Sequence, residues 1–70
     1  MKTLFNCARD IRHGALESRM VARMETEGRE LTDEETKQEC KYILETIDCA
    51  GYEPEEVRNI KAACRYILKK

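Results

Sequence analysis

The sequence contains no tryptophan, one phenylalanine, one proline and three glycines among its 70 residues. The scarcity of proline and glycine, together with the absence of long polar tracts, argues against a disordered chain. No apolar run reaches the roughly 18 residues that a membrane-spanning helix needs. Arg9 and Asp10 interrupt the apolar stretch near the N-terminus, so this stretch does not have the pattern of a signal peptide. We therefore expect a cytoplasmic protein with no membrane partner.

A chain of this length forms one small domain, which we place over residues 1–70. Folding buries only about 60% of the unfolded surface of a chain this short. Apolar burial and the entropy cost of ordering the chain are then of similar size, so little stability remains for a deep enzyme pocket. With 41% hydrophobic and 39% charged residues, the composition is typical of short amphipathic helices.

The net charge of -1 hides three segments of very different charge. Residues 1–23 carry +3, residues 24–56 carry -9 and residues 57–70 carry +5. A protein that binds nucleic acid without sequence specificity normally has a basic excess over the whole chain. This chain has no such excess.

Three helices are predicted, at approximately residues 3–27, 33–50 and 54–69. Gly28 and Gly51 end the first two, because glycine readily takes the left-handed conformation that follows a helix. Thr32 and Glu35 form a capping-box pattern at the start of the second helix, and Pro54 suits the first position of the third. No alternation with a period of two indicates a strand, so the predicted class is all-α.

The short connection between the second and third helices predicts an antiparallel hairpin, against which the long N-terminal helix packs. If this hairpin is centred on Tyr52, Cys40 lies opposite Cys64 and Leu44 lies opposite Ile60. These matched apolar pairs support the register. The same register places the acidic start of the second helix beside the basic end of the third, and we expect these charges to pair weakly.

The N-terminal helix carries two stripes of residues when positions are placed 100° apart. One stripe is rich in small side chains, and we expect it to cover the hairpin closely: Leu4, Cys7, Ala8, Ile11, Ala15, Ser18 and Ala22. The other is an exposed row of large apolar side chains and arginines: Phe5, Arg9, Arg12, Leu16, Arg19, Met20, Arg23 and Met24. A contiguous apolar patch on a surface is typical of a binding site, so these eight residues are predicted to bind a partner.

This helix is also longer than its neighbours, at about 37 Å against roughly 25 Å for each helix of the hairpin. It either projects beyond the hairpin or bends near Gly14, where a glycine inside a helix costs about 1 kcal/mol relative to alanine. A helix with two apolar faces in so small a chain favours self-association. We expect a homodimer formed through this helix.

Neither metal binding nor catalysis is predicted from the four cysteines and the single histidine. No two cysteines have the Cys-x-x-Cys spacing of a zinc site, and His13 lies six residues from Cys7, on a different helical face. No carboxylate orients the histidine as a nucleophilic pair requires. Cys40 and Cys64 could form a disulfide or remain two reduced core thiols, and the sequence leaves this open. We expect no enzyme activity, cofactor or metal.

The sequence therefore predicts a non-enzymatic protein that binds and modulates another macromolecule. Small regulators, among them phage-type inhibitors of host proteins, combine this size and charge pattern with the lack of a catalytic site. A partner protein would present an acidic surface if the N-terminal arginines bind it, or a basic surface if the acidic middle segment does. The sequence does not decide between these two surfaces.

DNA binding through a helix-turn-helix is the alternative function. Gly51, Val57 and Ile60 have the spacing of such a unit. The bulky Ile47 lies where the two helices would have to cross closely, and Glu55 lies in the first turn of the helix that would face the DNA phosphates. Nucleic acid is therefore the less favoured partner.

Overall fold

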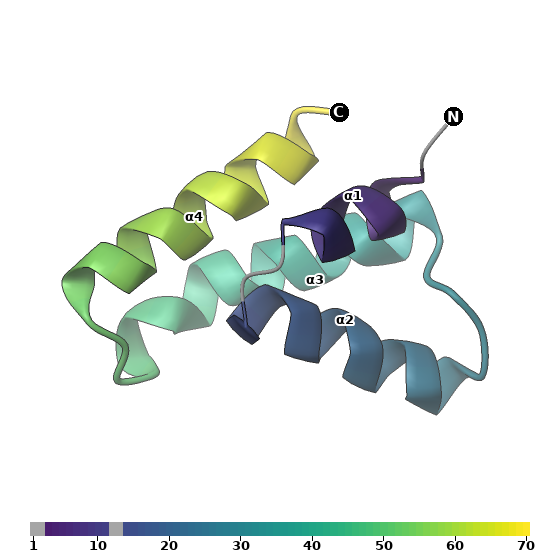
Figure 1. Cartoon of the computed structure of the whole chain (residues 1–70), viewed down its shortest axis with the longest axis horizontal. Coiled ribbons are helices and arrows are strands. Elements are labelled where there is room, and N and C mark those ends of the chain that lie inside the picture. Colours follow the sequence, from purple (N-terminus) through teal and green to yellow (C-terminus); the bar gives the residue numbers. More distant parts are fainter. Residues whose placement is uncertain (1–2, 12–13) are drawn as a thin grey trace.

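The computed structural model describes residues 3–11 and 14–70, and these residues form helices and loops but no strand. The α-helices are α1 (Leu4–Asp10), α2 (Gly14–Glu27), α3 (Asp33–Thr46) and α4 (Pro54–Leu68), and a 3-10 turn, η1 (Ile47–Cys49), follows α3 (Figure 1). The all-α class is confirmed, whereas the described residues form four α-helices rather than three. None of these helices is long and apolar enough to cross a membrane.

The helices α3 and α4 form the expected antiparallel hairpin, with α3 at the centre of the molecule (Figure 1). Cys40 of α3 and Cys64 of α4 meet between the two helices, and neither has any exposed surface. Ile60 is also fully buried, and Leu44 packs against the same core. The matched apolar residues therefore lie at the hairpin interface, as their spacing predicts.

Local sequence signals define the ends of the hairpin helices. The hydroxyl of Thr32 accepts a hydrogen bond from the N–H of Glu35 at 3.2 Å, and the Glu35 carboxylate accepts one from the N–H of Thr32 at 2.9 Å. This completes the capping box at the start of α3. Gly51 has a φ of 84°, which suits glycine in the turn before α4. The helix α3 ends earlier than expected because the chain tightens into η1, where Ile47 is buried.

The expectation of one helix over residues 3–27 is wrong, because the chain forms two shorter helices there. The first ends at Asp10 and the second begins at Gly14, the residue at which the sequence suggested a bend. Both pack against α3 and against each other (Figure 1). Each short helix can turn its own apolar side inward, whereas a straight helix of the same length would leave one stripe in solvent.

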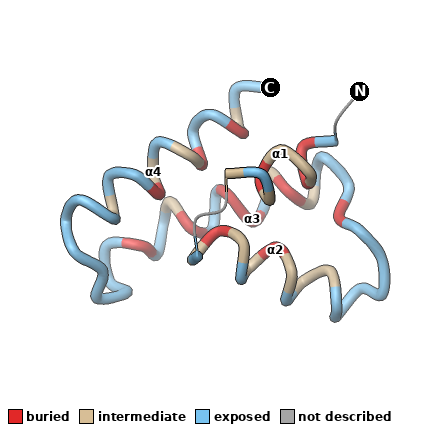
Figure 2. Tube along the Cα trace, viewed as in Figure 1, coloured by how far each residue is buried: buried red, intermediate tan, exposed pale blue. Residues whose placement is uncertain are grey.

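The buried face of α2 consists of its large apolar side chains rather than its small ones. Leu16 and Met20 have no exposed surface, whereas Ser18 and Ala22 are exposed. The expectation that the small-residue stripe covers the hairpin is therefore wrong for α2. Burying leucine and methionine removes more apolar area from water than burying serine and alanine, so this orientation is the more stable one. Figure 2 shows the buried positions gathered where α1, α2 and α4 meet α3.

The start of α1 is attached to the start of α3 by a polar contact. The N–H of Leu4 donates a hydrogen bond to Asp33 Oδ1 at 3.1 Å, and the N–H of Asn6 donates one to the hydroxyl of Thr3 at 3.1 Å. The first N–H groups of a helix have no partner within the helix itself. Asp33 and Thr3 therefore satisfy two such groups of α1 and hold this short helix in place.

The hairpin core predicts a large effect of Ile60→Ala on stability. Because Ile60 is fully buried, its truncation should lower the free energy of unfolding by about 2–5 kcal/mol. Val57→Ala, on the same helix but at a half-buried position, should cost about 1 kcal/mol. Urea unfolding followed by circular dichroism measures both changes, and equal losses would contradict the deeper burial of Ile60.

Candidate partner-binding surfaces

Three of the eight residues expected to bind a partner lie in the core. Phe5, Leu16 and Met20 have no exposed surface, and Met24 is half-buried against the same core. The expectation of an exposed apolar row is wrong, because the apolar residues of the predicted homodimer surface pack in or against the core of the chain itself. A helical wheel drawn over one continuous helix does not allow for the break between α1 and α2.

The α2 arginines of the same row are held by contacts within the chain. Arg19 lies 2.9 Å from Glu39, and its guanidinium stacks over Tyr42 with 4.1 Å between the guanidinium carbon and the ring centroid. Arg23 lies 3.1 Å from the other oxygen of Glu39. These arginines therefore attach α2 to α3 rather than facing solvent as free charges.

The two other arginines of the predicted set belong to the N-terminal part of the chain. The guanidinium carbon of Arg9 lies 5.7 Å from the ring centroid of Phe5, a cation–π contact at the end of α1. Arg12 lies outside the described residues.

Glu39 explains why two arginines gather at this place. Glu39 is only 7% exposed, and a buried carboxylate is costly unless hydrogen bonds and opposite charges compensate for the lost water. Arg19 Nε and Arg23 Nη1 each donate a hydrogen bond to it at 3.1 Å. The expected pairing of the acidic start of α3 with the basic end of α4 is therefore wrong, because Glu39 pairs with α2 and Asp33 with α1.

A second carboxylate of α3, Glu35, combines helix capping with an ion pair. Arg29 Nη1 lies 2.7 Å from Glu35 Oε1, the same oxygen that accepts the hydrogen bond from the N–H of Thr32. The hydrogen bond from Arg29 and that from the Thr32 backbone lower the pKa of Glu35 from 4.5 to about 2. The carboxylate therefore stays charged over most of the pH range and closes the loop between α2 and α3.

A shallow hollow of about 420 Å³ lies beside these ion pairs. It is lined by Ser18, Arg19, Ala22, Arg23, Thr26, Glu27 and Glu39. Each of its four charged side chains takes part in an ion pair. The hollow therefore offers small side chains and neutralised charges, which gives a charged partner little to recognise.

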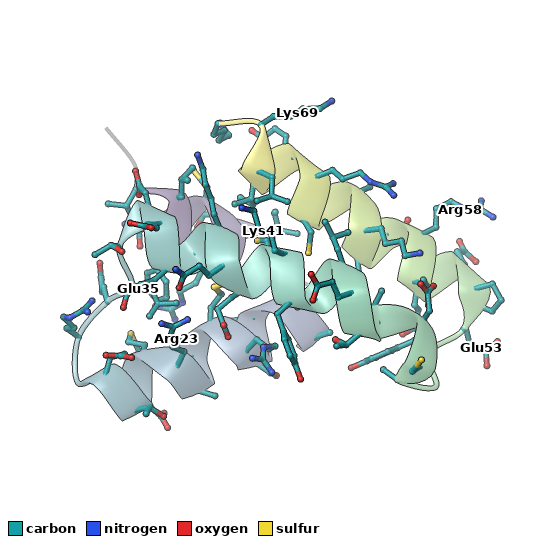
Figure 3. The ribbon with its side chains drawn as sticks, turned by 180° about the vertical axis from the view of Figure 1, so that it is seen from behind. Arg23, Glu35, Lys41, Glu53, Arg58 and Lys69 are labelled. Atoms are coloured by element: carbon teal, nitrogen blue, oxygen red, sulfur yellow. The ribbon has the colours of Figure 1, made fainter. Side chains whose placement is uncertain are left out.

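The back of the hairpin carries a second group of cations, separate from the arginines that contact α3. Figure 3 shows this side, with Lys41 on α3, Arg58 on α4 and Lys69 directly after α4. We define the basic face by five residues: Lys37, Lys41, Arg58, Arg65 and Lys69. Within residues 3–11 and 14–70, none of these five side chains forms an ion pair. No carboxylate of the described residues neutralises these five charges.

The charges of the hairpin are divided between its two ends. Because α3 and α4 are antiparallel, Lys37 and Lys41 lie toward the same end as Arg65 and Lys69 (Figure 1). Asp48, near the turn, pairs with Lys61 at 2.9 Å. The turn end also holds a group of exposed carboxylates: Glu45, Glu53, Glu55 and Glu56. The exposed charges are therefore mostly basic toward the open end and mostly acidic toward the turn, with Arg58 near the turn and Glu34 near the open end as exceptions (Figure 3).

An exposed tyrosine follows Arg65 on α4. Tyr66 is 54% exposed, and the ammonium of Lys70 lies 4.7 Å from the centroid of its ring. Tyrosine and arginine are enriched in the cores of protein interfaces because they offer both apolar area and hydrogen-bonding groups. Tyr66 thus adds an apolar contact to the charges of the basic face.

Sequence reasoning missed the basic face, although one signal for it was present. Residues 57–70 hold five basic and no acidic residues, and this excess was attributed to pairing within the hairpin. The structure instead uses the carboxylates of α3 to hold α1 and α2. Within residues 3–11 and 14–70, Arg58 and Arg65 of α4 are left without an ion pair for that reason, whereas Lys61 pairs with Asp48.

The described part of the chain contains no group of three or more histidine, cysteine, aspartate or glutamate side chains that could hold a metal ion. Comparison of the chain with protein-family models, curated proteins and solved structures found no match. The function must therefore be inferred from the surfaces themselves.

The buried ion pair predicts that Glu39→Gln destabilises the protein by about 1–3 kcal/mol, because the two arginines lose their common counter-charge. The loss is smaller than for a fully buried pair, since the Arg19 and Arg23 side chains are 41% and 28% exposed and regain water. Glu45→Gln, at an exposed position of the same helix, is the matched control and should change stability little. Equal effects of the two changes in urea unfolding would contradict this role of Glu39.

The lowered pKa of Glu35 predicts a pH-dependent contribution to stability. A carboxylate with a depressed folded-state pKa stabilises the protein above its unfolded value of 4.5, and this contribution is lost as the pH falls toward about 2. The stability difference between the wild type and Glu35→Gln should therefore be constant near neutral pH and shrink between pH 4.5 and about 2. Thermal unfolding across this range measures it, and a difference that does not change with pH would contradict the assignment.

Proposed function

We propose that the protein is a small non-enzymatic binding protein that engages an acidic surface of a partner protein through its basic face. The observation that carries this proposal is the contrast between two sets of cations. Arg19, Arg23 and Arg29 each contact a carboxylate of α3 at 3.1 Å or less. The five cations of the basic face contact none in the described residues.

Positive charges that lie near one another repel, so the cluster of cations toward the open end of the hairpin adds no stability to the fold. An acidic surface placed over the basic face relieves that repulsion and attracts the protein during the encounter. Tyr66, at the edge of the face, supplies the apolar area that charge contacts alone lack.

The charges around the basic face favour a protein over nucleic acid as the partner. Glu34 and Glu45 are exposed on α3, the helix that carries Lys37 and Lys41. A uniform row of phosphates would be repelled by these carboxylates, whereas a protein surface of mixed charge can match them. In addition, α4 runs back along α3 and opens with glutamates, so it does not present its N-terminal end to a groove as a recognition helix does (Figure 1).

A protein of this kind acts by covering part of its partner's surface. Such masking is how a small regulator or inhibitor works, because the partner's own ligand is then excluded from the covered area. The proposal needs no catalytic group and no cofactor in this chain.

The test compares two double variants that each remove two positive charges. Lys41→Ala with Arg65→Ala removes charge from the basic face, and Arg9→Ala with Arg29→Ala is the matched control outside it. Acidic proteins captured from nuclease-treated host lysate by the wild type should be retained by the control and lost by the first variant. With a purified captured protein, calorimetry should show an affinity about tenfold lower for the first variant only.

Two outcomes would contradict the proposal. One is equal affinity of the two double variants for the captured protein. The other is tight binding of a 20-base-pair DNA duplex at physiological salt, with an affinity that falls steeply as salt rises, since this dependence marks phosphate contacts. Circular dichroism spectra of both variants establish that any loss of binding is not a loss of fold.

A further inference from the structure

Two of the four cysteines lie together in the core of the hairpin. Cys40 on α3 and Cys64 on α4 have no exposed surface, and both belong to the core where these two helices pack together. Each thiol shifts the pKa of the other, so the two side chains lie next to each other, and both are free thiols. The other two cysteines are placed differently, because Cys7 is half-buried on α1 and Cys49 is exposed in η1. One pair of thiols is therefore held together by the fold itself.

We propose that Cys40 and Cys64 are a reversible modification site, at which a small-molecule disulfide such as oxidised glutathione converts the two thiols into a disulfide between α3 and α4. The Cys64 thiolate attacks one sulfur of the oxidant, forms a mixed disulfide and releases one glutathione thiolate. The Cys40 thiolate then attacks the Cys64 sulfur, closes the internal disulfide and releases the second glutathione. The protein loses two protons and two electrons, and the oxidant is reduced to two thiols.

The contact between the thiols supports this order of attack. The hydrogen bond from Cys40 lowers the pKa of the Cys64 thiol and raises the pKa of the Cys40 thiol. A thiol with a lower pKa supplies more of the thiolate that attacks a disulfide. Because neither sulfur is exposed, the oxidant reaches Cys64 only when the side chains around the thiol pair move aside, so we expect slow formation.

The disulfide would join the helices that carry the basic face. It closes a loop that contains the whole turn of the hairpin, and such a cross-link reduces the freedom of the unfolded chain. We expect the midpoint of thermal unfolding to rise by about 10 °C on oxidation. The open end of the hairpin would then no longer separate when the protein is challenged by heat or denaturant.

The experiment uses the full chain with Cys7→Ser and Cys49→Ser, which leaves the core pair unchanged. After incubation of the folded protein with oxidised glutathione, its mass should fall by about 2 Da, with no glutathione adduct remaining. Trypsin should release residues 38–41 joined to residues 62–65, because lysine or arginine precedes and ends each peptide. Dithiothreitol should restore both thiols and the original unfolding midpoint.

The matched control adds Cys40→Ala to the same chain, so that Cys64 has no partner. This variant should accumulate the glutathione adduct instead of losing mass, and its unfolding midpoint should not rise. A stable adduct on the chain that retains both core cysteines would overturn the proposal. So would a disulfide that forms only after the protein is unfolded in urea, because the native contact would then play no part.

Discussion

The structure depends on a single helix, α3, that is covered by each of the other three α-helices. Its side chains must therefore satisfy different neighbours on different sides. Cys40 faces α4, the carboxylate of Glu39 receives two guanidinium groups from α2, and Asp33 accepts the first N–H of α1. The most acidic segment of the chain is thus its structural centre, and its carboxylates are used to attach the N-terminal helices. Because of this use, Arg58 and Arg65 of α4 form no ion pair in the described residues, whereas Lys61 pairs with Asp48.

The hairpin could be predicted from the sequence because its signals are local. The capping pattern at Thr32 and Glu35, the glycine at position 51 and the proline at position 54 act within a few residues of where they occur. The N-terminal half could not be predicted in the same way. Its apolar residues are compatible with one helix that has two apolar faces or with two helices that each have one, and only packing on α3 decides between them. Gly14 was the local indication of the break.

The candidate binding surfaces could also be predicted from the sequence only in part. Arginines and apolar residues at helical spacing give the same sequence pattern whether the apolar side chains lie in the core or on the surface. Leu16 and Met20 lie in the core. Whether a charged side chain forms an ion pair depends on which residues lie near it in space. The sequence does not reveal this when the partners are far apart in the chain. Arg23 and Arg19 are 16 and 20 residues from Glu39. The basic excess at residues 57–70 was visible, but its availability followed only from the pairing of α3 with α2.

The separation of charge along the hairpin also affects how the protein moves before any contact is made. Unpaired cations lie mostly toward the open end and exposed carboxylates mostly toward the turn, so the two helices of the hairpin carry opposite charge at their two ends although the net charge of the chain is only -1. In the field of a charged surface such a molecule experiences mainly a torque rather than a net pull. Near a negatively charged surface, this charge separation favours orientations in which the open end of the hairpin leads. A nearly neutral protein can in this way approach a negatively charged surface in one preferred orientation.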